Sequence, residues 1–421
     1  MIGVYDILFG DRNIRREFTQ ISGESKPMLS RIKQIVSNYS KALLNGDFRS
    51  PSKAPVMIFD KMGSEPIKKA LSEISSTVLP LRGEKYFLSP KIIISMLIRN
   101  VKTSLGQKRG AIDFIKTLTH LTLSNYIESC ISHIQPKVVV TFIDNYYPFY
   151  SISSKFPKIT FVAIQNGWRT PLIIEPIDKN TTNPVYYFCL GEHDRGLFSP
   201  KDYDPDRIIT AGSLRESLWR KNQVPSKETY DICITSQWRE SLFGSNSPYP
   251  LFSESLVLFY KHMAQIISSH DIKCCLAFSQ RSDEEYNFFK TIFADSVYIP
   301  PRESPMTTYD LMNASKMVVT HNSTSGIEAM GMGRRALFFD PPTEQRGYYG
   351  DPKTEKMFVL DNTYESLQNR VLEVLNMNDD EYETELGEIS RFMIASQEQA
   401  SCGDILYNFA LDCIKKGSRE I

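Results

Sequence analysis

A hydroxyl-rich turn at residues 322–326 carries the side chains best suited to binding a phosphate or a diphosphate. An apolar, β-branched run at residues 317–320 precedes the turn, and a helix-forming segment with Glu328 near its start comes after it. The first amides of a helix have no intrahelical partner and the helix dipole is positive there, so this turn would present donors to an anion. Its members are Asn322, Ser323, Thr324, Ser325 and Gly326.

Two interpretations of this turn are open. In the first, the hydroxyls and the glycine backbone hold a phosphate, and Glu328 accepts hydrogen bonds from the two hydroxyls of a ribose. In the second, the turn is an N-cap without a ligand, because serine and threonine commonly start helices. His321 begins the turn and could contact the same phosphate, although a buried structural histidine is equally compatible with the sequence.

Polar side chains also follow other apolar runs that are typical of strands. The runs cover residues 55–59, 137–143, 159–164 and 231–235. In an open parallel sheet, ligands bind beyond the carboxyl ends of the strands, so these side chains are candidates for one cleft. They are Asp60, Asp144, Asn145, Gln165, Asn166, Arg169, Gln237 and Arg239.

Each of these residues has a functional and a structural interpretation. Asp144 is the predicted catalytic carboxylate, with Asp60 as its rival, and its alternative is an Asx turn or a helix cap. Arg169 could clamp a phosphate or a sugar carboxylate through two parallel hydrogen bonds, or form a surface ion pair. Gln165 and Asn166 could bind sugar hydroxyls, although Asn166-Gly167 also suits a tight turn. Asn145, Gln237 and Arg239 are predicted to bind substrate because they would face the cleft.

The elements that position these residues are strands alternating with helices along 421 residues, which predicts an α/β protein of two Rossmann-like domains facing a cleft. The polar segment 220–229 is the predicted linker. The first domain would span residues 1–219 and bind the acceptor. The second would span residues 230–400 and bind a nucleotide-sugar.

Composition excludes some classes of partner. Lys plus Arg and Asp plus Glu both number 49, so no electrostatic case exists for nucleic acid. No apolar run approaches the roughly 20 residues of a membrane span, and the N-terminus lacks signal-peptide character. The seven cysteines show no metal-binding spacing, which favours reduced thiols in the cytoplasm. No Asp-x-Asp pair for a nucleotide-bound cation is evident at a strand end, so no metal site is predicted.

The pattern at residues 318–340 resembles the GT-B glycosyltransferases, whose corresponding turn and helix hold nucleotide phosphates and ribose. Segments 55–65, 138–169 and 211–216 further resemble bacterial surface carbohydrate biosynthesis proteins, with the retaining β-Kdo transferases of capsule and O-antigen assembly as relatives. The resemblance implies transfer of a sugar from a nucleotide-sugar, with a CMP-linked sugar such as CMP-Kdo preferred, to a growing surface polysaccharide. It also implies a C-terminal helix, residues 401–421, that returns to the first domain.

Partners and location are implied by the same resemblance. The nucleotide-sugar would be a co-substrate with no further cofactor, and the acceptor would be an oligosaccharide or a lipid-linked chain. The protein is expected in the cytoplasm, with possible peripheral contact with the inner membrane through cations at residues 415–419. Two alternatives are a polyol-phosphate transferase that uses a CDP-activated alcohol, and a non-catalytic binding protein of the same fold.

Overall fold

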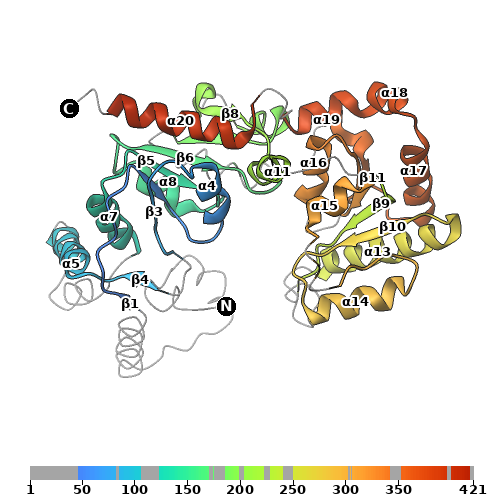
Figure 1. Cartoon of the computed structure of the whole chain (residues 1–421), viewed down its shortest axis with the longest axis horizontal. Coiled ribbons are helices and arrows are strands. Elements are labelled where there is room, and N and C mark those ends of the chain that lie inside the picture. The colour runs from blue at the N-terminus through green and yellow to red at the C-terminus, as the bar shows by residue number, and fades with distance from the viewer. Residues whose placement is uncertain are drawn as a thin grey trace. The chain divides into compact units, whose positions relative to one another are not determined.

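The chain folds as two compact units (Figure 1). Unit 1 comprises Met1–Ile164, Lys179–Tyr187 and Gly403–Ile421, and unit 2 comprises Gln165–Asp178 and Phe188–Cys402. The structure is a computed structural model that describes residues 46–81, 85–105, 123–169, 174, 185–198, 203–221, 228–239, 250–301, 304, 306–341, 352–395 and 400–417.

These units differ in their bounds from the domains expected from sequence. Contacts group residues 188–219 with unit 2, whereas the polar segment 220–229 suggested a boundary after them. Residues 222–227 of the predicted linker lie outside the described residues, so the linker itself stays a prediction. The last helix, α20 (Cys402–Gly417), has nearly all of its residues in unit 1.

Unit 1 is built on parallel strands connected by helices. β2 pairs with β3 on one side and with β5 on the other, and β5 pairs with β6, all in parallel. The full sheet has the order β3-β2-β5-β6-β7-β8, and β1 and β4 form a separate pair. The elements are β1 (Gly46–Asp47), β2 (Val56–Ile58), α4 (Ser64–Ala70), β3 (Ser76–Val78), β4 (Tyr86–Phe87), α5 (Pro90–Leu105), α7 (Leu123–Ile134), β5 (Val138–Thr141), α8 (Tyr147–Ser153) and β6 (Thr160–Ile164).

The last two strands of this sheet are β7 (Tyr186–Cys189) and β8 (Ile208–Thr210). Between them lie α10 (Glu192–Arg195) and a 3-10 turn (Pro205–Arg207), and α11 (Leu214–Arg220) comes after β8. The boundary between the units falls within β7, so the elements after it group with unit 2. Ser213 starts α11, because its side chain accepts a hydrogen bond from the Glu216 amide.

Unit 2 contains a five-stranded sheet with the order β10-β9-β11-β12-β13. The pairings β10–β9, β9–β11, β11–β12 and β12–β13 are all parallel. The elements are β9 (Tyr230–Thr235), α13 (Pro250–His270), β10 (Cys274–Ala277), α14 (Asp283–Phe293), α15 (Thr308–Asn313), β11 (Ser315–Thr320), α16 (Thr324–Gly331), β12 (Arg335–Phe339), β13 (Phe358–Val359), α17 (Tyr364–Asn376), α18 (Asp379–Tyr382) and α19 (Glu388–Met393).

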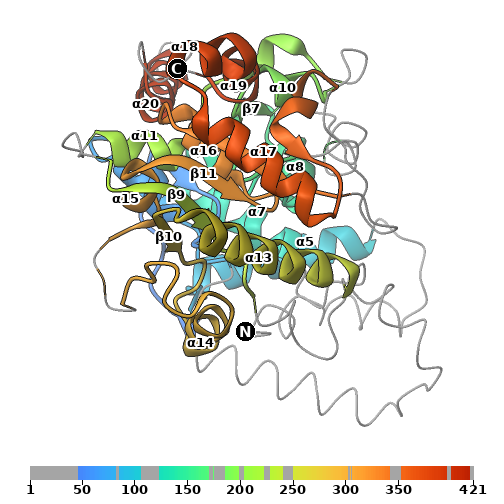
Figure 2. The same cartoon turned by 90° about the vertical axis from the view of Figure 1, so that its right-hand side faces the viewer.

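Helices cover both faces of the unit 2 sheet. Ile232 and Ile234 of β9 pack in the larger core, which α13 and α17 complete. Cys233, between them, faces a second core with Leu311 of α15 and Ala329 of α16. This alternation is the period of two that a strand imposes on its side chains. Figure 2 shows α13 and α17 lying in front of the sheet in the turned view.

From the sequence we also predict a strand at residues 296–299. In the structure these residues make only an isolated bridge, between Tyr298 and Cys275, instead of a further strand of the sheet. Both sheets nevertheless have a point where the strand order turns back: between β2 and β5 in unit 1 and between β9 and β11 in unit 2. Such switch points are where open α/β sheets bind ligands, beyond the carboxyl ends of the strands.

Candidate functional site

The hydroxyl-rich turn lies directly after β11, at the switch point of unit 2. Ser323 is the N-cap of α16, and its Oγ accepts from the Ser325 amide at 3.3 Å and from the Ser325 hydroxyl at 2.8 Å. Thr324 Oγ1 accepts from the Trp168 amide at 2.8 Å. Because the Ser323 and Thr324 oxygens both act as acceptors, their own hydroxyl protons remain for donation. The turn is therefore both an N-cap and a source of donors, so the two interpretations from sequence are compatible.

The loop at residues 165–169, after β6, packs against this turn. Besides the Trp168–Thr324 bond, the Trp168 ring lies 5.9 Å from Phe338 and 5.4 Å from Phe358, centroid to centroid. Gln165 holds the loop in shape: its Nε2 donates to the Gly167 carbonyl at 2.9 Å, and its Oε1 accepts from the Leu190 amide at 3.1 Å. The loop at 165–169 and the turn at 322–326, whose bonded residues Trp168 and Thr324 are 156 positions apart, are thus in direct contact within unit 2.

Arg169 is 5% exposed, and its guanidinium is turned back onto its own loop. Its Nη1 donates to the Trp168 carbonyl at 2.9 Å and its Nη2 donates to Asn166 Oδ1 at 2.7 Å. These bonds orient the loop that carries Trp168. A direct contact of Arg169 or Asn166 with a sugar or a phosphate stays a prediction.

Gln237 and Asn322 connect the ends of β9 and β11. Gln237 Oε1 accepts from the Asn322 amide at 3.2 Å, and Gln237 Nε2 donates to Asn322 Oδ1 at 3.0 Å. Asn322 Nδ2 in turn donates to Asp340 Oδ1, after β12, at 3.1 Å. The three strand ends on this edge of the sheet are therefore tied together by side chains. Arg239, two residues beyond Gln237, is exposed and makes no hydrogen bond or ion pair with the residues that the structure describes.

His321 lies beneath the turn. Its Nε2 is 2.9 Å from Ser255 Oγ of α13, and its ring packs edge-on against Phe252 and Phe339 at 5.1 and 5.9 Å. The side chain is buried in the core of unit 2, which matches the structural interpretation. A phosphate contact for His321 stays a prediction.

Gly326 is explained by packing. A Cβ at this position would lie 2.6 Å from Phe338 Cε1 and 3.0 Å from Thr320 Cγ2. The missing side chain therefore lets α16 lie close against β11 and β12, which fixes where the amides at its start point. The sequence suggested a different reason for this glycine, the approach of an anion to the backbone.

Glu328 lies one turn into α16 and is buried. Its Oε1 accepts from Ser213 Oγ, at the start of α11, at 2.6 Å. Burial raises the pKa of the Glu328 carboxyl, and the hydrogen bonds from Ser213 and Tyr309 and the nearby charge of Arg215 oppose that rise. Burial likewise raises the pKa of Glu216, which accepts from Arg220 Nε at 2.7 Å. The site therefore holds a desolvated carboxylate beside hydroxyl groups.

The two predicted catalytic carboxylates lie in unit 1. Asp60 follows β2 and Asp144 follows β5, at the ends of neighbouring strands. Asp60 is 1% exposed, and its Oδ1 accepts from the Met62 amide at 2.8 Å. Asp144 is 0% exposed; its Oδ2 accepts from the Tyr187 hydroxyl at 2.6 Å, and its backbone carbonyl accepts from the Tyr150 hydroxyl at 2.6 Å. Asn145, next to Asp144, is exposed.

Trp168 and Ser213 belong to the site although their residue types did not predict it. In the sequence, Trp168 stands among the polar residues that follow a predicted strand, and nothing there indicates a partner. In the structure, its backbone amide donates a hydrogen bond to Thr324 Oγ1. Ser213 follows β8 in another strand–turn–helix segment, and it is the hydrogen-bond donor to Glu328. The sequence feature that could have indicated Ser213 is a serine placed after a strand and before a helix, as an N-cap. That feature alone cannot reveal a partner 115 residues away.

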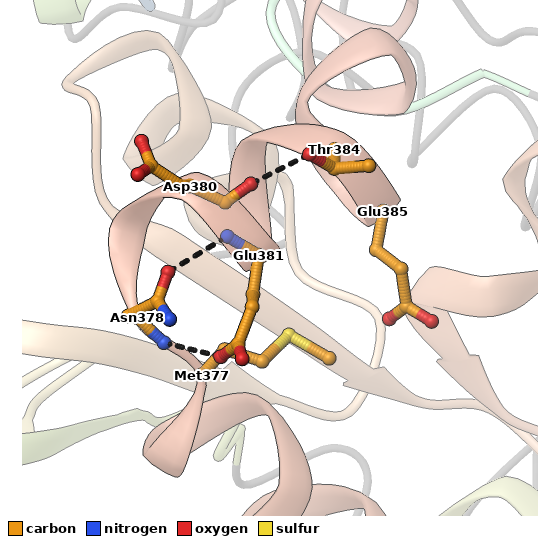
Figure 3. A pocket seen from close by; sticks show the side chains of 6 residues that line it. All are labelled: Met377, Asn378, Asp380, Glu381, Thr384 and Glu385. Carbon is orange, nitrogen blue, oxygen red and sulfur yellow. Dashed lines mark hydrogen bonds between the residues drawn. The ribbon is translucent and has the colours of Figure 1, made fainter.

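A separate pocket of about 530 Å³ opens in unit 2 beside α18 (Figure 3). Its polar groups serve to cap helices: Asn378 and Glu381 bond each other's backbone amides, and Thr384 Oγ1 donates to the Asp380 carbonyl at 2.7 Å. None of the candidate residues lines it, and its carboxylates would repel a phosphate. The lining residues are Met377, Asn378, Asp380, Glu381, Thr384 and Glu385.

Two features are absent from the part of the chain that the structure describes. No helix within it is long and apolar enough to cross a bilayer. No cluster of three or more His, Cys, Asp or Glu side chains in the same ranges could hold a metal ion.

Comparison with known proteins gives a family match over part of the chain. Residues 162–348 match the model of a family described as "putative O-antigen biosynthesis protein". This range begins just before the loop at 165–169 and includes Ser213, Gln237 and the turn with Glu328, but neither Asp60 nor Asp144. No curated protein matches the chain.

Solved structures show the fold. The structure of S. aureus MnaA with UDP is similar with a TM-score of 0.53 at 10% identity, over 88% of this chain and 98% of that one. A "putative UDP-N-acetylglucosamine 2-epimerase" of Listeria monocytogenes gives 0.52 at 14% identity, with the same coverage. A glycosyltransferase of Rickettsia africae gives 0.48 at 11% identity, over 88% and 100%. The chain therefore has the GT-B fold, as the sequence predicted.

Proposed function

We propose that this protein is a GT-B glycosyltransferase that moves a sugar from a nucleotide-sugar to a growing bacterial surface polysaccharide, with unit 2 binding the nucleotide. One observation carries the proposal. The loop at 165–169 is hydrogen-bonded to Thr324 at the start of α16, and Glu328, bonded to Ser213, lies one turn further along the same helix; all of these residues lie within the range that matches the O-antigen biosynthesis family.

Unit 2 would hold the nucleotide at the start of α16. The Ser323 and Thr324 hydroxyls still have protons to donate, and the first amides of the helix add donors and a positive dipole, which together suit a phosphate. Glu328 would accept from the ribose hydroxyls, with Ser213 fixing one of its oxygens. The phosphate is the leaving group of sugar transfer, so these donors would stabilise the negative charge that develops on it.

Unit 1 would supply the carboxylate that acts on the sugar. Glycosyl transfer passes through an oxocarbenium-like state, and a carboxylate can serve as base or nucleophile. Asp144 is our assignment and Asp60 its rival, because both stand at the switch point between β2 and β5. The Tyr187 hydroxyl donates to Asp144 Oδ2 at 2.6 Å, which fixes the orientation of the carboxyl group.

A CMP-linked acidic sugar such as CMP-Kdo is the donor we propose, with a lipid-linked or oligosaccharide acceptor. This choice rests on the resemblance to surface carbohydrate proteins rather than on a contact in unit 2. A polyol-phosphate transferase and a non-catalytic binding protein remain the alternatives that the sequence raised.

A nucleotide-sugar epimerase is a second candidate. One of the similar structures with a TM-score above 0.5 is described as a "putative UDP-N-acetylglucosamine 2-epimerase". The same nucleotide site would serve it. The difference lies in the products: an epimerase yields a sugar of inverted configuration that still carries the nucleotide, whereas a transferase passes the sugar to an acceptor and releases the nucleotide.

A two-stage experiment separates these functions. First, thermal shift with CMP, CDP, UDP and GDP identifies the nucleotide that stabilises the protein. Second, the matching nucleotide-sugars are incubated with and without an oligosaccharide or lipid-linked acceptor, and products are separated by chromatography. Release of nucleotide together with an elongated acceptor supports transfer. A C2 epimer formed from UDP-N-acetylglucosamine without acceptor, and without released UDP, would replace the proposal by the epimerase.

A further inference from the structure

Helix α5 of unit 1 presents an apolar face to solvent. Ile94, Leu97 and Ile98 are 56%, 43% and 50% exposed, and their spacing of three and four residues places them on one side of the helix. The opposite side is buried, with Ile92 and Met96 packed inward. Large aliphatic side chains in such a row are unfavourable in water unless something covers them.

The charged side chains of α5 all have one sign. Lys91 precedes Ile94 by three residues and Lys102 comes four residues after Ile98, so both lie along the same side of the helix. Both lysines are exposed, and neither forms an ion pair with another residue that the structure describes. Arg99 is already paired with Glu128 of α7 at 2.7 Å. The sixteen residues of α5 contain no aspartate or glutamate.

We propose that this face of α5, defined by Ile94, Leu97, Ile98, Lys91 and Lys102, docks on the surface of an anionic lipid bilayer. Aliphatic side chains would enter the boundary between headgroups and acyl chains, while the lysine amines would stay at the level of the anionic headgroups. A bilayer supplies both chemistries along a flat surface, which matches a row of three aliphatic residues edged by two cations. The helix would lie in the interface plane without crossing the membrane.

This surface lies in unit 1, whereas the nucleotide site that we propose lies in unit 2. It also differs from the C-terminal cations that the sequence suggested. Lys415 and Lys416 end α20, and Figure 1 shows α20 and α5 in different parts of unit 1. Ser418 and Arg419, also in the predicted contact, lie outside the described residues. The two surfaces can therefore be altered separately.

The test is co-sedimentation of the full chain with vesicles of phosphatidylcholine alone and of phosphatidylcholine with about one-third phosphatidylglycerol. We expect binding to the anionic vesicles at low salt. The triple variant Ile94→Ser, Leu97→Ser, Ile98→Ser should weaken vesicle binding by about tenfold or more. The double variant Lys91→Gln, Lys102→Gln should weaken vesicle binding by roughly tenfold, and the remaining binding should depend less on salt. These side chains are exposed, so the variants should fold, which circular dichroism and the thermal shift with nucleotide would verify.

Two matched controls sharpen the test. Tyr298→Ser removes an exposed apolar side chain from unit 2 and should leave vesicle binding unchanged. Lys415→Gln with Lys416→Gln removes cations from α20 and should also leave it unchanged. The proposal is overturned if the wild-type chain does not sediment with anionic vesicles, or if only the α20 variant loses binding. It is also overturned if the wild-type chain is a dimer that the serine variant dissociates, with no binding to vesicles, because the face would then be covered by a second copy.

Discussion

The switch points of the two sheets use the same sequence pattern for different arrangements. In unit 1, the strand ends at β2 and β5 carry Asp60 and Asp144, which are almost fully buried and bonded within their own unit. In unit 2, the ends of β9 and β11 carry Gln237 and Asn322, which are partly exposed and bonded to each other. A polar residue after a strand therefore does not by itself reveal whether it faces a ligand.

The difference arises from the segment that comes after each strand. After β5, the aromatic-rich helix α8 packs into the core, and the Tyr150 hydroxyl donates a hydrogen bond to the Asp144 backbone carbonyl. After β11, small hydroxyl residues start α16, and Gly326 lets that helix lie tightly on the sheet while its first turn stays accessible. The first turn of α16 in unit 2 is thus partly exposed, whereas the carboxylates of unit 1 are buried and bonded within their own unit.

The largest expected effect is a loss of turnover, and it tests the catalytic role assigned to Asp144 in unit 1. If Asp144 is the catalytic carboxylate, Asp144→Asn should lower turnover by several orders of magnitude because the base or nucleophile is removed, while nucleotide affinity is retained. Asparagine can still accept from Tyr187, so the fold should persist. Steady-state kinetics with the donor and acceptor that the two-stage experiment identifies would measure it. Normal turnover would transfer the role to Asp60, for which Asp60→Asn is the matched variant.

The next largest effect is a loss of nucleotide affinity, and it tests the role of Thr324 in unit 2. Thr324→Val removes the hydroxyl that accepts from the Trp168 amide and could donate to a phosphate. We expect nucleotide binding to weaken by about 1–3 kcal/mol, because the half-buried amide loses its partner and the ligand loses a donor. Calorimetry would measure it. Thr324→Ser keeps the hydroxyl and should restore affinity; equal affinities for the two variants would remove Thr324 from the site.

A third prediction concerns how α16 is placed. Gly326→Ala introduces a Cβ 2.6 Å from Phe338, so it should destabilise unit 2 by about 1–3 kcal/mol and weaken nucleotide binding as the helix shifts. Gly333 has a positive φ of 76° and nothing within 4 Å of an added Cβ. Gly333→Ala should therefore cost only about 1 kcal/mol, from backbone strain. Urea unfolding compares them, and equal losses would contradict the packing argument.

The smallest expected effect concerns pH. Burial raises the pKa of Glu216 above its ordinary value of 4.5. The folded state then keeps the proton to a higher pH than the unfolded state, so stability falls as pH rises from the ordinary pKa through the raised one. Glu216→Gln should raise Tm at pH 7, and the gain should vanish below about pH 4.5. A lower Tm of Glu216→Gln at pH 7 would contradict this prediction, because it would show that the ion pair of Glu216 with Arg220 stabilises the fold by more than burial of the charge destabilises it.

The sequence was sufficient for the fold and for much of the unit 2 turn. The apolar run at residues 317–320 predicts β11, and α16 begins at Thr324, within the turn, because Ser323 acts as its N-cap. Gly333 lies just past the end of that helix with a positive φ, a conformation that glycine favours. These features are local, so local residue types determine them.

The contacts that assemble the site were not readable from the sequence. Trp168 and Thr324 are 156 residues apart, and Ser213 and Glu328 are 115 apart. Such pairs depend on the order of strands in each sheet, which periodicity does not specify. The buried orientations of the His321 and Arg169 side chains likewise depend on residues that the sequence does not place beside them.

The most direct measurement of the central claim is the affinity of CMP, UDP and GDP for the wild-type chain and for Glu328→Ala, by isothermal titration calorimetry. At least one nucleotide should bind the wild-type chain, and Glu328→Ala should weaken it by about 1–3 kcal/mol, because the ribose loses a buried acceptor. Glu328→Gln, which keeps an acceptor oxygen, should fall between them. If all three nucleotides bind the folded alanine variant as they bind the wild-type chain, or if none binds the wild-type chain, unit 2 does not hold the nucleotide through Glu328.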